Sequence, residues 1–201
     1  MMSFFFMTAM VVNSAGSHIA KVLFSADDIK RRVGAVGRKL ALDYADRKPL
    51  VMGTLTGAFI FTADLVRAME PCPLDMDVTF CQASSYGSGT QSSGNVKLNT
   101  CSHIPVKNRN VILVEDIVDT GGTLSTLMKA LLGAGAESVE CVALLNKAEG
   151  RTVDVEAKYV CFQCPNEFVV GYGLDFDQHY RCLPYVGVLK PEVYNNYERG
   201  E

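Results

Sequence analysis

Residues 111–124, with the sequence VILVEDIVDTGGTL, decide the predicted fold of this 201-residue chain. Four consecutive apolar residues at 111–114 indicate a strand that is buried on both faces, as in a parallel sheet. The glycines at 121–122 indicate a tight turn, and the residues at 123–133 have the pattern of a helix. A strand, a short turn and a helix in this order are the repeating unit of α/β proteins.

The segment 119–123, DTGGT, is suited to bind an anion. Its glycines allow successive backbone N–H groups to face one ligand, and the helix that follows adds the positive end of its dipole. The hydroxyl groups of Thr120 and Thr123 are further donors. An ordinary glycine turn with a capping threonine has the same sequence, so the loop alone does not define a phosphate site.

Three carboxylates, Glu115, Asp116 and Asp119, stand beside this loop, where they would repel a simple anion. A sugar phosphate removes the conflict, because carboxylates accept hydrogen bonds from the 2′ and 3′ hydroxyls of a ribose. Carboxylates are also the oxygen ligands that Mg²⁺ shares with phosphates. The stretch therefore predicts a ligand that carries a phosphate together with a sugar diol.

Apolar periodicity predicts further elements on both sides of this unit. Helices are expected at 26–45 and 58–69, and strands at 49–55, 74–81, 138–146, 159–163, 168–172 and 185–189. Along 74–81 the residues Leu74, Met76, Val78 and Phe80 alternate with Asp75, Asp77, Thr79 and Cys81, which predicts a strand with one apolar face inward. The alternation of strands and helices predicts one α/β domain over 19–201 with a mostly parallel sheet.

Ligands of parallel α/β sheets bind beyond the carboxyl ends of the strands. Gly57, the acidic cluster at 115–119 and Lys147 each follow a predicted strand. We therefore expect these residues, which are distant in sequence, to meet at one edge of the sheet.

Composition argues against several classes of partner. The formal net charge is −3, so there is no basic surface that would favour nucleic acid or an acidic membrane. The chain has seven cysteines, an odd number without disulfide-framework spacing, which indicates free thiols in a reducing compartment. Cys161 and Cys164 form a CxxC, but nothing completes a zinc site, and we expect both to be small buried apolar residues.

The N-terminal residues 1–18 are unusually apolar. The run at 4–12 is too short to span a bilayer, and no Lys or Arg precedes it as in a signal peptide. We expect residues 1–18 to be a disordered extension, with a targeting role as the weaker alternative, and the protein to be cytoplasmic.

The stretch 111–124 resembles the phosphoribosyl-pyrophosphate signature of the phosphoribosyltransferases. Between about Ile19 and Tyr194 the chain also resembles the hypoxanthine-guanine branch of that family, in 55–57 (LTG), 84–87 (SSYG), 144–147 (LLNK), 167–175 (EFVVGYGLD), 180–181 (YR) and 185–191 (YVGVLKP). The resemblance implies the type I phosphoribosyltransferase fold, a mostly parallel central sheet flanked by helices, with a small hood of N- and C-terminal segments. It also implies a homodimer or homotetramer.

The implied activity is Mg²⁺-dependent purine salvage. A 5-phosphoribosyl group passes from phosphoribosyl pyrophosphate to hypoxanthine or guanine, which gives IMP or GMP and pyrophosphate. Two alternatives remain: a xanthine-preferring enzyme of the same fold, and a non-catalytic nucleotide-sensing regulator. A regulator could have lost Asp119 or Lys147 and would more often carry a basic face, whereas this chain has both residues and a negative net charge.

The resemblance also assigns roles to individual residues. The phosphoribosyl group would be bound by Glu115, Asp116, Asp119, Thr120, Gly121, Gly122 and Thr123, with Asp119 as the general base that accepts the proton of purine N7. Pyrophosphate would be bound by Leu55, Thr56, Gly57 and Arg181. The purine would be bound by Lys147, Phe168, Val169 and Asp175. Mg²⁺ would be held near Glu115, Asp116 and Asp175, and a lid at about 83–95 would close through Ser85 and Tyr86.

Lys147 and Thr56 bear most on substrate choice and product release. Lys147 can donate a hydrogen bond to O6 of a 6-oxopurine, whereas adenine presents an amino donor there and is disfavoured. Thr56 is a departure, because many relatives carry Lys at this position in the pyrophosphate loop. Backbone N–H groups can still bind the ligand, but pyrophosphate affinity and the order of product release can differ. In relatives the peptide bond that enters this residue can be cis.

Overall fold

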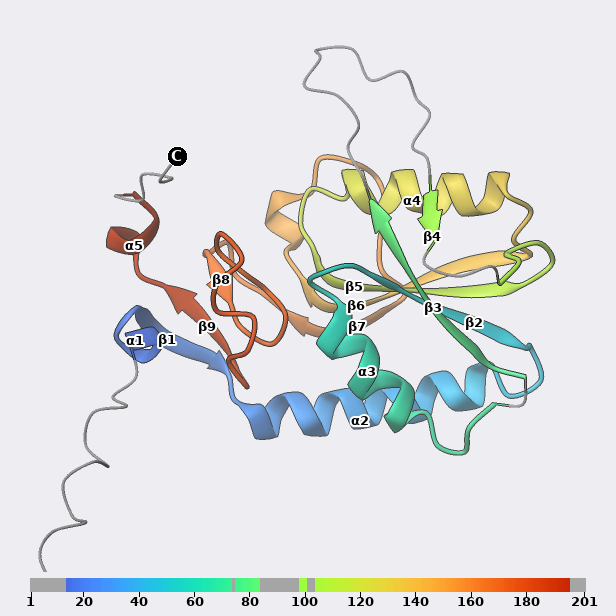
Figure 1. Ribbon diagram of the computed structural model, residues 1–201, viewed down its shortest axis with the longest axis horizontal. Coiled ribbons are helices and arrows are strands. Elements are labelled where there is room, and N and C mark those ends of the chain that lie inside the picture. The colour runs from blue at the N-terminus through green and yellow to red at the C-terminus, as the bar shows by residue number, and fades with distance from the viewer. Residues whose placement is uncertain (1–13, 74, 84–97, 101–103, 196–201) are drawn as a thin grey trace, which may run out of the picture.

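The computed structural model describes residues 14–73, 75–83, 98–100 and 104–195. These residues form a six-stranded sheet and a separate three-stranded sheet (Figure 1). The larger sheet has the strand order β4-β3-β2-β5-β6-β7, and its strands are β2 (Pro49–Thr54), β3 (Asp77–Ala83), β4 (Leu98–Thr100), β5 (Asn110–Val118), β6 (Ser138–Asn146) and β7 (Tyr159–Gln163). Strands β3, β2, β5, β6 and β7 are parallel, and β4 is an antiparallel edge strand.

Helices cover both faces of the larger sheet, as the sequence predicted. The helices α2 (Ala26–Asp43) and α3 (Phe59–Ala68) lie on one face, and α4 (Gly122–Gly133) lies on the other (Figure 1). Helix α2 begins with a capping box in which Ser25 and Asp28 satisfy each other's backbone N–H groups.

Strand β5 divides the core into two layers. Its residues Ile112 and Val114 pack with the α2 and α3 side chains, whereas Val111 and Leu113 pack with the leucines of α4. This alternation follows from the two-residue period of a strand. Both faces of β5 are therefore buried up to Glu115, where the acidic cluster begins.

The smaller sheet, which we call the hood, joins the two ends of the described chain. It has the order β1-β9-β8 and contains β1 (Ile19–Phe24), β8 (Val169–Val170) and β9 (Val186–Leu189), all antiparallel. The short helices α1 (Ser14–Ser17) and α5 (Pro191–Asn195) lie beside it (Figure 1). The type I fold with a hood, expected from the resemblance, is therefore confirmed, although the sequence pattern did not predict β1.

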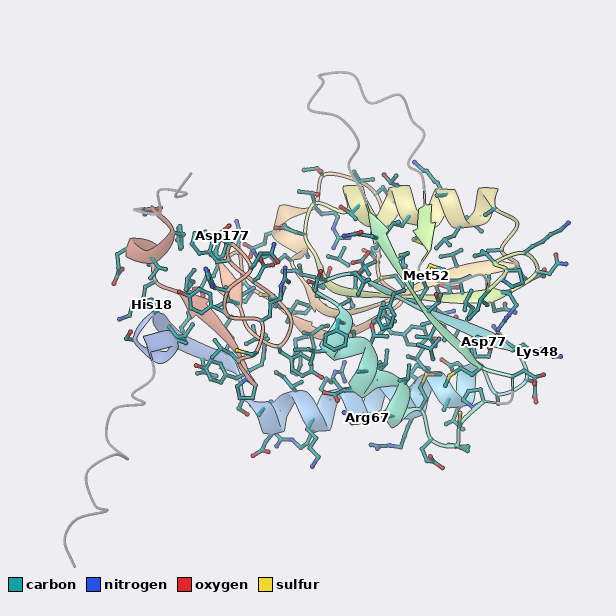
Figure 2. All side chains as sticks on the ribbon, in the orientation of Figure 1. His18, Lys48, Met52, Arg67, Asp77 and Asp177 are labelled. Carbon is teal, nitrogen blue, oxygen red and sulfur yellow. The ribbon has the colours of Figure 1, made fainter. Side chains whose placement is uncertain are left out.

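Residues 14–18, which the sequence analysis assigned to the N-terminal extension, are part of the described structure. Residues 14–17 form α1, and the backbone oxygen of His18 accepts a hydrogen bond from the N–H of Lys190 at 2.9 Å. His18 Nδ1 also lies 2.6 Å from the hydroxyl of Tyr180, and Figure 2 shows His18 at the hood end of the molecule. Residues 14–18 thus belong to the folded domain, and residues 1–13 lie outside the described residues.

The prediction for the faces of β3 was wrong. Thr79 and Cys81 are buried, while Val78 is 40 % exposed. Cys81 packs in the layer beneath α4, so the face that carries Thr79 and Cys81 points to the core. The opposite face of β3 is only partly covered. The prediction failed because the two-residue period of the sequence does not show which of the two faces of the strand packs against the core.

Two further expectations concern cysteines and membranes. Cys161 and Cys164 are both buried in the α2-side layer, and burial raises the pKa of each thiol, which fits inert apolar residues. Among the described residues, no helix is both long enough and apolar enough to cross a bilayer.

Candidate active site

The candidate site lies where the carboxyl ends of β2, β5 and β6 face the hood (Figure 1). The loop 55–58 follows β2, the loop 119–121 follows β5, and Lys147 follows β6. The sequence prediction that these three segments meet at one sheet edge is confirmed by the topology, because β2 and β6 are the two neighbours of β5.

The glycine loop forms a small cavity at the N-terminus of α4. Gly121 has φ +86°, a left-handed conformation that glycine adopts without strain, and α4 begins at Gly122. The cavity has a volume of about 100 Å³ and is lined by Glu115, Ile117, Val118, Asp119, Thr120, Gly121, Thr123 and Leu124. Two carboxylate residues, Glu115 and Asp119, and residues of the glycine loop thus line one concave surface.

Glu115 is the most deeply buried carboxylate of the site. It is 6 % exposed, and its Oε2 accepts a hydrogen bond of 2.7 Å from the hydroxyl of Thr54. Its other oxygen, Oε1, is buried and has no partner among the described residues. Burial raises the pKa of Glu115 to about 8, and the hydrogen bond from Thr54 opposes the rise. A ligand that donates to Oε1 or brings positive charge would favour the ionised form.

The raised pKa of Glu115 predicts a pH dependence of stability. Because the folded-state pKa of this acid lies above its ordinary value of 4.5, folding binds a proton that the unfolded chain releases. The contribution of Glu115 to the free energy of unfolding is therefore fully present below about pH 4.5, and it is lost as the pH rises toward about 8. A tenfold change in proton affinity corresponds to about 1.4 kcal/mol, and each kcal/mol changes the melting temperature of a domain of this size by roughly 2–4 °C.

This dependence can be measured with Glu115→Gln. In buffer with EDTA and no ligand, the melting temperature of the wild type should fall between pH 5 and pH 8 more steeply than that of the variant. Parallel curves for the two proteins would show that Glu115 does not titrate in this range.

Asp116 lies against the loop 55–57 that follows β2. Its Oδ1 accepts a hydrogen bond of 2.8 Å from the N–H of Ile117, and a Cβ placed on Gly57 would lie 1.6 Å from its Oδ2. Burial raises the pKa of Asp116, while the Ile117 N–H and the guanidinium of Arg181 oppose the rise. The Leu55–Thr56 peptide bond is cis, as the resemblance suggested. Gly57 therefore brings the loop into contact with the acidic cluster.

Gly57 also contacts the segment that follows β8 of the hood. A Cβ placed on Gly173 would lie 2.1 Å from the backbone oxygen of Gly57, and Gly173 itself has φ +103°. The loop after β2 is thus held between Asp116 on one side and the backbone of residue 173 on the other. A side chain larger than hydrogen at Gly57 would have to displace the carboxylate of Asp116.

For the phosphoribosyl donor that the resemblance implies, we expect Gly57→Ala to lower kcat/KM by roughly 100-fold, because displacement of reacting groups by about 1 Å has effects of this size. Gly133→Ala is the matched control, since a Cβ at Gly133 meets nothing within 4 Å. Steady-state kinetics of the two variants measure the difference. Wild-type kinetics for Gly57→Ala would contradict a role for this close contact.

Asp119 and Lys147 lie together beside the cavity. Lys147 is only 9 % exposed, and its Nζ is 3.8 Å from Oδ2 of Asp119. The backbone N–H of Lys147 donates to the oxygen of Val118 at 2.9 Å, which fixes the lysine next to the loop. A Cβ placed on Gly150 would lie 2.0 Å from Oδ1 of Asp119, so this carboxylate rests against a bare backbone. A buried lysine beside an acid is not the surface charge that a lone lysine after a strand would suggest.

Arg181 and Asp175 form a second charged pair on the hairpin that follows β8. Nη2 of Arg181 lies 2.9 Å from Oδ1 of Asp175, and Nη1 of Arg181 donates to the backbone oxygen of Gly173 at 2.7 Å. Gln178 adds a backbone N–H to Oδ2 of Asp175 and accepts from Arg181. The hairpin therefore presents one cation near Asp116 and Gly57, the two contacts of the pyrophosphate loop.

Phe168 immediately precedes β8 and is held by two aromatic rings. It is 40 % exposed, its ring stacks on Tyr194 of α5 at a centroid distance of 5.0 Å, and it meets Phe176 edge-on at 5.6 Å. Val169 is buried in β8. Sequence reasoning missed Tyr194 and Phe176, and only their aromatic type offered a signal. Ser85 and Tyr86 of the expected lid lie outside the described residues.

The sequence pattern of one protein family matches most of the chain. The phosphoribosyl transferase domain matches residues 23–177. The chain is also similar to hypoxanthine-guanine phosphoribosyltransferase from Streptococcus thermophilus, with 48 % identity over 177 residues, which cover 88 % of this chain and 97 % of that protein.

A longer relative contains the same region. The bifunctional protein TilS/HprT from Listeria monocytogenes is 47 % identical over 182 residues, which are 90 % of this chain but 28 % of that protein. This chain therefore corresponds to little more than a quarter of the length of that relative.

Solved structures agree with this relationship. The crystal structure of a hypoxanthine phosphoribosyltransferase from Staphylococcus aureus superposes with a TM-score of 0.83 at 37 % identity, covering 92 % of this chain and 100 % of that one. Together with the glycine loop, its acidic wall and the hood, these similarities show that the chain belongs to the phosphoribosyltransferase family, in its hypoxanthine-guanine branch.

Proposed function

We propose that this protein is a purine salvage enzyme. It transfers the 5-phosphoribosyl group of phosphoribosyl pyrophosphate to hypoxanthine or guanine and releases IMP or GMP and pyrophosphate. The observation that carries the proposal is the buried Lys147, whose Nζ lies 3.8 Å from Asp119 at the edge of the glycine-loop cavity. This pair supports the proposal, because a carboxylate can accept a proton and an ammonium can donate a hydrogen bond beside the cavity.

In the proposed complex the glycine loop binds the 5′-phosphate. The N–H groups of the loop and the hydroxyls of Thr120 and Thr123 donate to the phosphate oxygens, and the N-terminus of α4 adds its dipole. Glu115 and Asp116 face the ribose hydroxyls. The unpartnered Oε1 of Glu115 supports this assignment, because a buried oxygen without a donor is expected to gain one from the ligand.

The purine is bound between the glycine loop and the hood. Lys147 donates to O6 of a 6-oxopurine, Phe168 stacks on the ring, and the backbone of Val169 meets the base edge. Asp119 accepts the proton of N7 as the new glycosidic bond forms, which is worth roughly 10²–10⁴-fold in rate. Adenine would set its amino group against the ammonium of Lys147, so it is a poor substrate.

Pyrophosphate leaves toward the opposite side of the site. The backbone of Leu55, Thr56 and Gly57 and the guanidinium of Arg181 bind it there. Lys is absent at position 56, so Arg181 and the backbone supply most of the positive potential from the protein.

Mg²⁺ fits the donor set of the site as a cofactor. Among the described residues, no group of three or more His, Cys, Asp or Glu side chains is arranged to hold a metal alone. Mg²⁺ commonly takes one or two carboxylates together with substrate phosphates, and Glu115 offers a free buried oxygen for this purpose. Asp116 and Asp175 are the other candidate ligands. When bound, the ion stabilises charge on the leaving pyrophosphate.

The assembly and location of the enzyme are also proposals. We propose a homodimer or homotetramer, as the family resemblance implies, which light scattering at several concentrations tests. We propose a cytoplasmic location, because the cysteines of the described residues, Cys72, Cys81, Cys141, Cys161, Cys164 and Cys182, are free thiols. Free thiols are typical of a reducing compartment.

Release of pyrophosphate distinguishes an enzyme from a regulator of the same fold. We expect purified protein with phosphoribosyl pyrophosphate and Mg²⁺ to release pyrophosphate only when hypoxanthine or guanine is added, and EDTA to abolish the release. Binding of the donor without any release would support the regulator instead. Release with xanthine alone would support the xanthine-preferring alternative.

A further inference from the structure

Arg151 lies beneath the glycine loop, where its guanidinium donates to uncharged oxygens. Its Nε donates to the backbone oxygen of Asp119 at 3.0 Å, and Nη2 donates to the oxygen of Val118 at 3.4 Å. The same nitrogen donates to Oδ1 of Asn146, and Nη1 donates to the oxygen of Val155. Arg151 is partly buried and donates to backbone and amide oxygens, so the planar arrangement of its guanidinium donors matters here as much as its charge.

The residues after Arg151 bond the next carbonyl of the same loop. The backbone N–H groups of Thr152 and Val153 donate to the oxygen of Thr120 at 3.0 and 3.2 Å, and the hydroxyl of Thr152 donates to it at 3.3 Å. A Cβ on Gly121 would lie 2.7 Å from Cγ1 of Val155. We call residues 150–155 the strap. The strap thus bonds three consecutive carbonyls, those of residues 118, 119 and 120.

Fixing these carbonyls also fixes the N–H groups that bind phosphate. In a planar trans peptide the C=O and the following N–H point in opposite directions. The carbonyl groups of residues 118, 119 and 120 point toward the strap. The N–H groups of residues 119, 120 and 121 therefore point away from it. The glycine-loop cavity lies on that other side, since residues 119–121 line it and no strap residue does.

We propose that Arg151 is a positioning residue for donor binding, which presets the glycine loop so that its N–H groups face the 5′-phosphate before the ligand arrives. The proposal rests on the proposed function. Arg151 does not line the cavity and acts only through the backbone of the loop. A preset site avoids the cost of ordering a flexible loop on binding, so loss of the strap should weaken donor binding specifically.

Arg109 provides a matched control at the other end of the sheet. Its Nε and Nη2 donate to the backbone oxygens of Lys48 and Pro49 at 3.1 and 3.2 Å, and its Nη1 pairs with Asp77 at 2.7 Å. Figure 2 shows Lys48 and Asp77 at the end of the molecule opposite the hood. Arg109 therefore makes a comparable set of bonds far from the candidate site.

The test compares Arg151→Lys with Arg109→Lys. Both substitutions keep the charge and remove the guanidinium fork. Loss of two or three net hydrogen bonds predicts a roughly 10- to 100-fold rise in KM for phosphoribosyl pyrophosphate in Arg151→Lys, with KM for hypoxanthine within threefold. Arg109→Lys should have a lower melting temperature, whereas its KM values for phosphoribosyl pyrophosphate and for hypoxanthine should stay unchanged. Unchanged donor KM in Arg151→Lys, or equal changes in both variants, would overturn the proposal.

A binding measurement separates this proposal from the proposed function. Calorimetry of ribose 5-phosphate, which needs no turnover, should show affinity for the wild type and a matching loss in Arg151→Lys. If the wild type binds neither ribose 5-phosphate nor phosphoribosyl pyrophosphate, the proposed function fails. If wild type and variant bind ribose 5-phosphate equally, only the role of the strap fails.

Asn146→Ala keeps the proposal testable if Arg151→Lys does not fold. This variant removes one acceptor that orients Arg151 and leaves the arginine in place. Gln163→Ala is its control, because it removes the 3.0 Å bond between Asn146 and Gln163 without touching Arg151. A rise of several-fold in donor KM for Asn146→Ala but not for Gln163→Ala supports the role of Arg151, and equal values overturn it.

Discussion

Asp119→Asn is expected to lower kcat by roughly 10²–10⁴-fold while the affinity for phosphoribosyl pyrophosphate stays within threefold. The amide has nearly the same size as the carboxylate, so it should fit against the backbone of Gly150 where Asp119 now lies. It cannot accept the purine proton as a base. The loss should therefore appear in turnover, with the donor-binding loop intact.

The measurement is a pair of titrations, with kcat from steady-state kinetics and donor affinity from calorimetry. Asp46→Asn is a suitable control, because Asp46 is an exposed residue in the turn after α2. An unchanged kcat would remove Asp119 as the general base. A parallel loss of donor affinity would assign it to ligand binding.

Lys147→Ala is expected to lower kcat/KM for hypoxanthine by roughly 10- to 100-fold, since hydrogen bonds from charged donors are worth about 1.5–3 kcal/mol. KM for phosphoribosyl pyrophosphate should change by less than threefold. Any trace of adenine turnover should not decline, because the unfavourable pairing of two donors is removed together with the ammonium. The preference for hypoxanthine over adenine should therefore shrink.

Lys158→Ala is the control for this variant. Lys158 pairs with Glu140 at 3.0 Å on the exposed edge of the sheet, so its loss should leave both kinetic constants unchanged. If Lys147→Ala weakened the donor and the base equally, the lysine would act on the loop as a whole and not on the base.

The central part of the site could be predicted from the sequence because its signals are local. The strand, glycine turn and helix of 111–133 contain the carboxylates and the glycine loop in one continuous segment. Gly57 and Lys147 could be added because parallel strands end at the same edge. The structure confirms this convergence, whereas the roles of the individual side chains stay predictions.

The rest depended on packing that leaves no local pattern. Strand β1 of the hood is mostly exposed, so its sequence has no two-residue period that would indicate a strand. The faces of β3 were assigned wrongly because Thr79 and Cys81 are buried by tertiary contacts that override their polarity. The role of Arg151 could not be predicted, because its hydrogen bonds go to backbone oxygens, and these are present at every residue and leave no signal in the sequence.

The contacts of single glycines were equally invisible. Nothing in the sequence indicates that Gly57 touches Asp116 or that Gly173 touches Gly57. These contacts join segments more than fifty residues apart in the chain. The contact of Gly57 with Asp116 depends on the pairing of β2 with β5, and its contact with Gly173 depends on the position of the hairpin after β8 relative to the sheet.

Product formation from each of four purines tests the proposed activity most directly. Purified protein, Mg²⁺ and phosphoribosyl pyrophosphate are incubated separately with hypoxanthine, guanine, xanthine and adenine, and the nucleotides are identified by chromatography. We expect IMP from hypoxanthine and GMP from guanine, with little or no AMP from adenine. Failure to form any nucleotide, despite measurable donor binding, would contradict the assignment of this chain as a purine salvage enzyme.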